Sequence, residues 1–137
     1  MEWNKILDKL NERTANTLMH TLNITYTNIG DGFLEATMPV DARVHQPYGY
    51  LHGGASMALA ESVGSAASHI FAGKDTKVLG LEFSANHLKT MQSGVVTARA
   101  EAVHLGRSTH LWQIRVTDEE GNLISLCKIT NIVLSHS

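Results

Sequence analysis

Residues 54–72 limit most strongly what this chain can fold into. They are almost entirely Ala, Ser, Gly and bulky aliphatic residues, and Gly73 follows as a suitable C-terminal cap. A helix that is apolar nearly all round must be surrounded by other elements. The stretch therefore predicts a buried helix with the rest of the chain built around it.

The segments before this helix predict one further helix and a hairpin. Apolar residues at helical spacing favour an amphipathic helix over residues 2–12, and residues 14–20 add at most a short turn. Residues 22–27 and 33–38 alternate in polarity, with a break at Gly30-Asp31-Gly32. Pro39 is expected to end the second of these strands.

After Gly73 the pattern is typical of strands. The four long runs cover residues 76–87, 94–104, 108–117 and 122–134, and the last three are expected to form a meander through short connections. About six strands and one long apolar helix predict an α+β fold with a curved antiparallel sheet around a central helix. Residues 1–137 are expected to form one domain, because no linker, repeat or low-complexity tract interrupts them.

Composition excludes several classes of function. A net charge of −2 and a pI near 6.4, without a long basic run, argue against nucleic-acid binding. No apolar run approaches membrane-spanning length, and residues 1–5 lack the layout of a secretory signal. Cys127, the single cysteine, falls in an apolar strand pattern and is expected to be a packed thiol. A reduced, cytoplasmic setting fits these features best.

Glu61 is the only acidic residue of the apolar helix. An ionised carboxylate in an apolar site must be paired, hydrogen-bonded or raised in pKa, so a buried Glu61 is a candidate general base or nucleophile. The alternative is a Glu at a subunit seam or one that reaches water. Ser65 lies four residues further on, on the same helix face, where it can bond Glu61 or a water. Helix serines also commonly bond back to the preceding turn.

The start of the helix carries groups suited to an oxyanion. Free N–H groups at Gly53 and Gly54, at the positive end of the helix dipole, attract developing negative charge. His52 and Gln46 flank this point and can orient a carbonyl or a water. Considered alone, His52 fits a helix cap equally well, and Gln46 fits a solvated loop residue. Together with Glu61, these groups are the components of acyl transfer.

The string Gln-Pro-x-Gly-x-x-His-Gly-Gly-Ala-Ser-x-x-Leu-Ala-Glu, from Gln46 to Glu61, resembles the active-site segment of hotdog-fold acyl-CoA thioesterases with a catalytic Glu in the central helix. It is most similar to small bacterial enzymes that act on aromatic acyl-CoA or aryl-carrier-protein thioesters, including those of menaquinone and enterobactin biosynthesis. The resemblance implies the hotdog fold and hydrolysis of such thioesters without a cofactor. It also implies that Glu61 attacks the thioester or activates water, and that the Gly53 N–H binds the thioester oxygen.

The resemblance also implies roles for residues outside the helix. His87 matches a position near the acyl or pantetheine part of the substrate, although a strand-end His can simply be solvated. The turn with Gly106, Arg107 and Ser108 matches a loop that binds the CoA nucleotide, and Arg suits phosphate, although most surface arginines grip nothing specific. The remaining histidines are interpreted as structural or solvated. No metal-binding motif occurs in the sequence.

The distance along the helix bears on the number of subunits. Gly53 and Glu61 are separated by about 12 Å at 1.5 Å per residue, so one Glu61 is not expected to reach a carbonyl bound at its own Gly53. An antiparallel second copy would supply it, in agreement with the dimers and dimers of dimers of the family. Two alternative functions are that of a hotdog hydroxyacyl-thioester dehydratase, whose His and acid are placed differently, and that of a non-catalytic acyl-CoA-binding module, which would not need Glu61.

Overall fold

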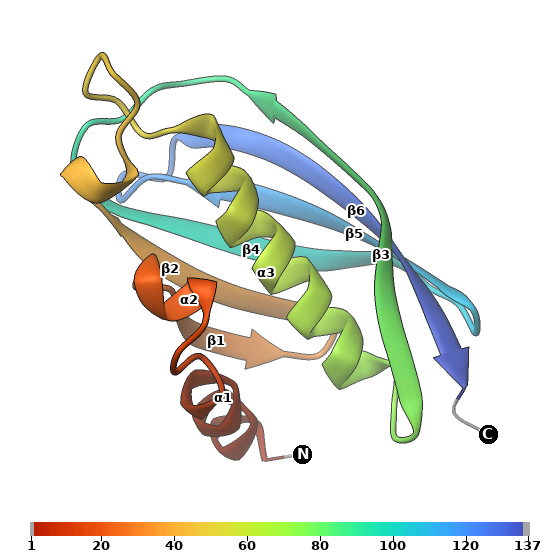
Figure 1. Cartoon of the computed structure of the whole chain (residues 1–137). Coiled ribbons are helices and arrows are strands. Elements are labelled where there is room, and N and C mark those ends of the chain that lie inside the picture. The colour runs from red at the N-terminus through yellow and green to blue at the C-terminus, as the bar shows by residue number, and fades with distance from the viewer. Residues whose placement is uncertain (1, 136–137) are drawn as a thin grey trace.

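The computed structural model of the protein describes residues 2–135, and its long helix α3 lies across one face of a six-stranded sheet (Figure 1). The elements in chain order are α1 (Trp3–Glu12), α2 (Leu18–Thr21), β1 (Thr25–Gly30), β2 (Phe33–Val40), the 3₁₀-helix η1 (Ala42–Val44), α3 (Gly53–Phe71), β3 (Thr76–His87), β4 (Gly94–Leu105), β5 (Thr109–Thr117) and β6 (Leu123–Ser135). This architecture confirms the predicted α+β fold. No helix within the described residues is long and apolar enough to cross a membrane.

The sheet is antiparallel throughout, with strand order β1-β2-β4-β5-β6-β3. β4, β5 and β6 are neighbours in both sequence and space, which confirms the predicted meander. β3 pairs only with β6 and forms one edge of the sheet, while β1 forms the other edge. The bounds of the four later strands agree with the predicted runs to within one residue.

The first hairpin differs from its predicted bounds for identifiable reasons. β1 begins at Thr25 rather than at residue 22, because Asn23 has a positive φ of 57°, which extended strands do not adopt. The prediction that Pro39 ends β2 was also wrong, since the strand continues to Val40. β1 pairs with β2 only as far as Thr37, so one side of β2 has no partner strand at Pro39. The N–H that proline lacks would not have made an inter-strand hydrogen bond on that side.

α3 buries one face on the sheet and leaves the other partly open. The side chains or Cα atoms that face the sheet are those of Ser56, Leu59, Ala60, Val63, Gly64, Ala67 and Ser68. The opposite face lies beside α1 and α2, so the prediction of a helix surrounded on all sides is wrong for the single chain (Figure 1). The predicted end is confirmed, because the helix stops at Phe71 and Gly73 follows with a φ of 90°.

Gly64 marks the closest approach of α3 to the sheet. A Cβ at this position would lie 2.6 Å from Cγ2 of Ile129 and 3.1 Å from Cδ1 of Ile114, both of which are fully packed. We expect Gly64→Ala to lower the melting temperature at fixed protein concentration, because overpacking costs about 1–3 kcal/mol and the gain in helix propensity is only about 1 kcal/mol. A melting temperature above that of the wild type would show that the sheet yields at this point.

The amide of Asn11 fastens α1 to the edge strand β1. Its Oδ1 accepts from the Tyr26 N–H at 2.8 Å, and its Nδ2 donates to the Tyr26 carbonyl at 2.9 Å. The side chain thus takes the place of a neighbouring strand at a sheet edge that would otherwise present unpaired backbone groups. This pair of bonds fixes the end of α1 relative to the sheet and to α3.

A buried polar cluster lies between α3 and the sheet. Ser68 Oγ accepts hydrogen bonds from Trp112 Nε1 and Asn131 Nδ2, both at 2.7 Å, and lies 3.0 Å from His110 Nδ1. Burial lowers the pKa of His110, and the nearby His104 lowers it further, so the imidazole is held neutral. Cys127 is buried, and burial raises the pKa of its thiol to about 11, which confirms the predicted packed thiol.

Candidate active site

Glu61 lies on the open face of α3. Its side chain is exposed in the single chain, which agrees with the alternative of a Glu that reaches water or lies at a subunit seam and not with a carboxylate buried inside the chain. The reason is that α3 turns only one face to the sheet, and Glu61 belongs to the other face. Ser65 lines the same cleft one turn further on, and neither a hydrogen bond from it to Glu61 nor one back to the preceding turn occurs among the described residues. It is Ser62 that bonds back, from its Oγ to the Ala58 carbonyl at 2.7 Å.

The N-terminus of α3 holds a capping histidine and one free N–H. Nδ1 of His52 accepts from the Gly54 N–H at 2.8 Å, so His52 has the capping role that its position at the helix start allows. The expectation that both glycine N–H groups are free is therefore corrected, since Gly54 is used by the cap. The Gly53 N–H has no acceptor among residues 2–135. With Nδ1 accepting, the neutral imidazole carries its proton on Nε2 and can donate it outward.

His87 lies against this helix end. A Cβ at Gly53 would lie 2.8 Å from Nε2 of His87, so only glycine allows the ring to approach this closely. Ser125, fully buried and opposite His87 in the β3–β6 pair, places its Oγ 2.7 Å from His87 Nδ1. The structure therefore brings together His52, Gly53 and His87. Ser125 was not among the predicted residues, and only the strand register reveals it as the partner of His87.

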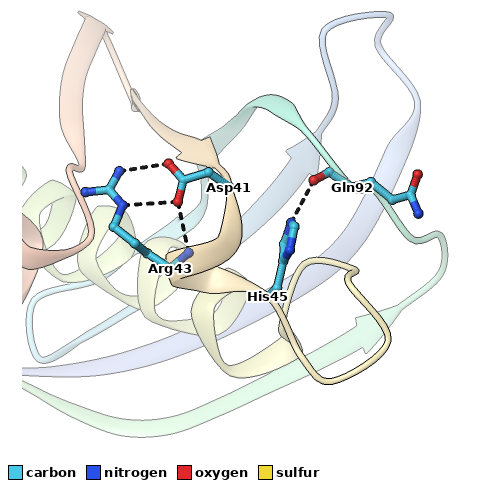
Figure 2. Close-up of polar contacts among 4 residues, drawn as sticks. All are labelled: Asp41, Arg43, His45 and Gln92. Carbon is cyan, nitrogen blue, oxygen red and sulfur yellow. Dashed lines mark hydrogen bonds and ion pairs between the residues drawn. The ribbon is translucent and has the colours of Figure 1, made fainter.

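Gln46 shapes the loop that precedes α3. Its Oε1 accepts from the backbone N–H groups of Tyr48 and Tyr50, so its carbonyl is occupied within the loop and its Nε2 remains as a donor. The loop is anchored from outside as well: His45 Nε2 lies 2.7 Å from the Gln92 carbonyl, as Figure 2 shows. This contact ties the loop to the connection between β3 and β4.

The segment before this loop is stabilised by an ion pair. The carboxylate of Asp41 accepts from the backbone N–H of Arg43 at 3.0 Å and from its guanidinium at 2.9 and 3.1 Å (Figure 2). Arg43 is exposed and Asp41 is partly exposed, and the hydrogen bond from Arg43 lowers the pKa of the Asp41 carboxyl. The pair fixes the turn η1 from which the loop departs.

A cleft of about 540 Å³ separates α1 and α2 from α3. One wall consists of Leu10, Arg13, Thr14, Leu18 and Met19, the other of Ala58, Glu61, Ser62, Ser65, Ala66 and His69, with Tyr26 between them. Burial raises the pKa of Tyr26 to about 12, so its phenol is neutral at physiological pH. The volume lies within the range of small-molecule sites.

A second cleft, of about 350 Å³, continues the first toward the start of α3. The two share Leu18 and Ala58, and the second reaches His45, His52 and Gly54. A groove therefore follows the open face of α3 from the capping histidine to Glu61. Most α3 residues along it are Gly, Ala or Ser, which allow a second helix to approach closely.

The structure does not bring the turn with Gly106, Arg107 and Ser108 to the start of α3 in the same chain. His87 pairs with Ser125 of β6, whereas Thr109, next to the turn, pairs with Ile132. These two levels of β6 are about 23 Å apart at 3.3 Å per residue. Figure 1 shows the β4–β5 turn at the opposite end of the sheet from the start of α3. Arg107 is exposed there.

The sheet with its long helix and the free N–H at the helix start define a hotdog-type acyl-transfer scaffold. A family model of the Thioesterase superfamily matches residues 48–125, more than half of the chain. The chain belongs to this superfamily and is a thioester hydrolase.

Relatives and solved structures agree with this assignment. The 1,4-dihydroxy-2-naphthoyl-CoA hydrolase of Escherichia coli is 43% identical over 128 residues, which cover 93% of this chain and 94% of the relative. A thioesterase from Haemophilus influenzae superposes with a TM-score of 0.91 at 43% identity, covering 94% and 90% of the two chains. A Staphylococcus aureus protein, solved as a Glu-to-Ala variant, has a TM-score of 0.83 at 39% identity over 86% and 98%.

Proposed function

We propose that this protein hydrolyses acyl-CoA or acyl-carrier-protein thioesters with an aromatic acyl group, in a site shared by two copies of the chain. The observation that carries the proposal is the combination of an unused Gly53 N–H at the start of α3 with Glu61 on the open face of the same helix. A free helix N-terminus stabilises a thioester oxyanion, and a carboxylate in reach of water and substrate serves as base or nucleophile.

The chemistry follows from these groups. The Gly53 N–H and the helix dipole polarise the carbonyl, and His52 Nε2–H and Gln46 Nε2 supply further donors near it. Glu61 then either attacks the carbonyl carbon, expelling the thiolate and leaving a mixed anhydride that water opens, or removes a proton from the water that attacks. In both routes the C–S bond breaks, the thiolate takes up a proton, and a free acid and a free thiol result.

Two features support a site built from two chains. Gly53 and Glu61 are about 12 Å apart along one helix, too far for one thioester carbonyl to contact both. β3 offers an exposed edge of 12 residues, of which only Val78 is buried, and such an edge readily pairs with a second copy. Each site would then take Gln46, His52 and Gly53 from one chain and Glu61 and Ser65 from the other. The minimum unit is a homodimer, and we extend the proposal to a dimer of dimers.

The relatives support the assignment of Gln46 and Glu61. The staphylococcal protein has been solved with a Gln replaced by Ala and with a Glu, 15 positions further along, replaced by Ala. The same spacing separates Gln46 from Glu61.

The name of the E. coli relative supports an aryl-CoA substrate, and the 540 Å³ cleft has room for an aromatic acyl group. A cytoplasmic location is part of the proposal, because the single thiol is buried and free.

A panel of CoA thioesters tests the proposed activity. Thiol release is followed with benzoyl, hydroxynaphthoyl, phenylacetyl and short and long aliphatic CoA esters, and kcat/KM is expected to be highest for the aromatic members. Preference for long aliphatic chains would contradict the aromatic assignment. Formation of an enoyl product from a hydroxyacyl-CoA, without thiol release, would identify a dehydratase instead.

Arg107 is expected to bind the nucleotide part of CoA and to take no part in the reaction. Arg107→Ala should raise KM for CoA thioesters several-fold with little change in kcat, because a phosphate contact far from the reacting carbon binds the ground state and the transition state alike. Hydrolysis of the matching acyl-pantetheine thioester, which lacks the nucleotide, should not change. Equal losses with both substrates would mean that Arg107 only supports the turn.

A further inference from the structure

Arg13 stands out among the residues that line the cleft between α1–α2 and α3. It is the only Lys or Arg in that lining, and it makes no ion pair or side-chain hydrogen bond with any described residue. By contrast, Arg43 and Arg99 are both paired with carboxylates. A guanidinium with unused donors beside a cleft can bind a ligand oxygen.

The backbone position of Arg13 is fixed by its neighbours in α1 and β1. It directly follows the last turn of α1, and its backbone N–H donates to the Lys9 carbonyl at 3.2 Å. Two residues earlier, the side-chain amide of Asn11 forms two hydrogen bonds with the backbone of Tyr26. Tyr26 itself lines the same cleft and reaches α3 through its hydroxyl, which lies 3.4 Å from the Ser62 carbonyl. α1, β1 and α3 therefore hold the backbone of Arg13 at the edge of the cleft that also contains Glu61.

The cleft has its charged groups on opposite walls. Glu61 is on the α3 wall together with the apolar Ala66, and Arg13 is on the wall formed by α1 and α2 together with the apolar Leu10 and Met19. If the carbonyl carbon of an acyl group lay at Glu61 and its ring filled the cleft, the far edge of the ring would face the wall that carries Arg13.

We propose that Arg13 is a specificity-determining residue, which selects aromatic acyl groups with a hydroxyl oxygen on the ring edge remote from the thioester. This inference rests on the proposed thioesterase function and adds the recognition of the acyl group. The guanidinium donates to the ring oxygen, while an unsubstituted ring fills the same apolar space without that bond. Arg13 takes no part in breaking the C–S bond.

The test compares benzoyl-CoA with its 3-hydroxy and 4-hydroxy derivatives in the full-length protein. Wild-type kcat/KM should be higher for at least one hydroxylated substrate than for benzoyl-CoA. Arg13→Met should lower the value for that substrate about tenfold, the effect of one charge-assisted hydrogen bond, and change benzoyl-CoA less than twofold. Arg13→Lys should fall between, because an ammonium keeps the charge but loses the planar fork. The control Lys9→Met removes an exposed cation of α1 outside the cleft and should change nothing.

Several outcomes would overturn the inference. Equal losses on all three substrates would make Arg13 a structural residue, and unchanged selectivity in Arg13→Met would remove it from recognition. If Arg13→Met does not fold, Arg13→Lys provides the test. Its ratio of kcat/KM for the hydroxylated substrate to kcat/KM for benzoyl-CoA should then lie below that of the wild type, and an unchanged ratio would overturn the inference. A wild type that hydrolyses benzoyl-CoA without preferring a hydroxylated ring overturns this inference alone. A wild type that releases no thiol from any of the three overturns the proposed aryl-CoA activity and this inference together.

Discussion

Glu61→Gln should abolish nearly all thioester hydrolysis while leaving the protein folded. Loss of a positioned general base typically lowers kcat by about 10²–10⁴-fold, and loss of a nucleophile lowers it further. The amide keeps the shape of the side chain but neither attacks a carbonyl nor takes a proton from water. Because Glu61 is exposed and makes no ion pair among the described residues, its charge is not needed for folding.

The measurement is thiol release under saturating substrate, alongside a thermal melt. Glu12→Gln provides a matched control, since Glu12 is also an exposed helical glutamate but lies outside the cleft. The control should keep the wild-type rate, and both variants should melt within a few degrees of the wild type. If Glu61→Gln retained a rate within threefold of the wild type, Glu61 would have to be removed from the reaction.

The sequence predicted the elements well wherever the local pattern is strong. The apolar helix ends where Gly73 predicts, and the three meander strands pair as their short connections require. The start of β1 could not be predicted from polarity alone. Leu22-Asn23-Ile24 continues the alternation of a strand, yet the left-handed conformation of Asn23 delays the strand to Thr25. The end of β2 could not be predicted from Pro39 either. Only the strand pairing shows that one side of β2 is unpaired at Pro39, so that a proline is tolerated there and the strand continues.

The helix composition described the packing of α3 on the sheet but not what lies over its other face. Small residues on that face, such as Ala58 and Ser65, look the same in sequence whether a sheet or a second helix covers them. The interpretation of Glu61 as a buried carboxylate followed from treating both faces alike, whereas the alternative of a Glu that reaches water or a subunit seam did not need a second covering layer. The open groove along α3 shows that the single chain leaves this face uncovered.

The site could be predicted in part, for a physical reason. His52, Gly53 and Glu61 lie in one continuous segment, so their spacing already fixes their relation along the helix. Arg13 and Ser125 are contributed by distant segments, and only the tertiary structure brings Arg13 to the cleft and Ser125 to His87. No local pattern around either residue differs from that of an ordinary surface arginine or strand serine.

Mixing two inactive chains should restore activity if each site takes residues from two copies. One chain carries Glu61→Ala and the other His52→Asn. Asn keeps a side-chain acceptor for the Gly54 N–H, so the helix cap is retained while the imidazole is lost. Each variant alone has every site damaged. In a mixed dimer, intact His52 and Gly53 of the first chain face intact Glu61 of the second, so one of the two sites is complete.

The expected recovery can be stated as a fraction. Co-refolding equal amounts gives mixed dimers as about half of the total, and one intact site in each gives about a quarter of the wild-type activity. Mixing the folded variants without co-refolding should recover less, because the subunits must exchange first. Tagging each chain differently and purifying over both tags isolates the mixed dimer and doubles the expected value to about half. If dimers isolated in this way stay as inactive as their parents, Glu61 must act on a thioester held at the Gly53 of its own chain. The 12 Å between them would then have to be closed by a movement within α3, against the rigid rise of a packed helix.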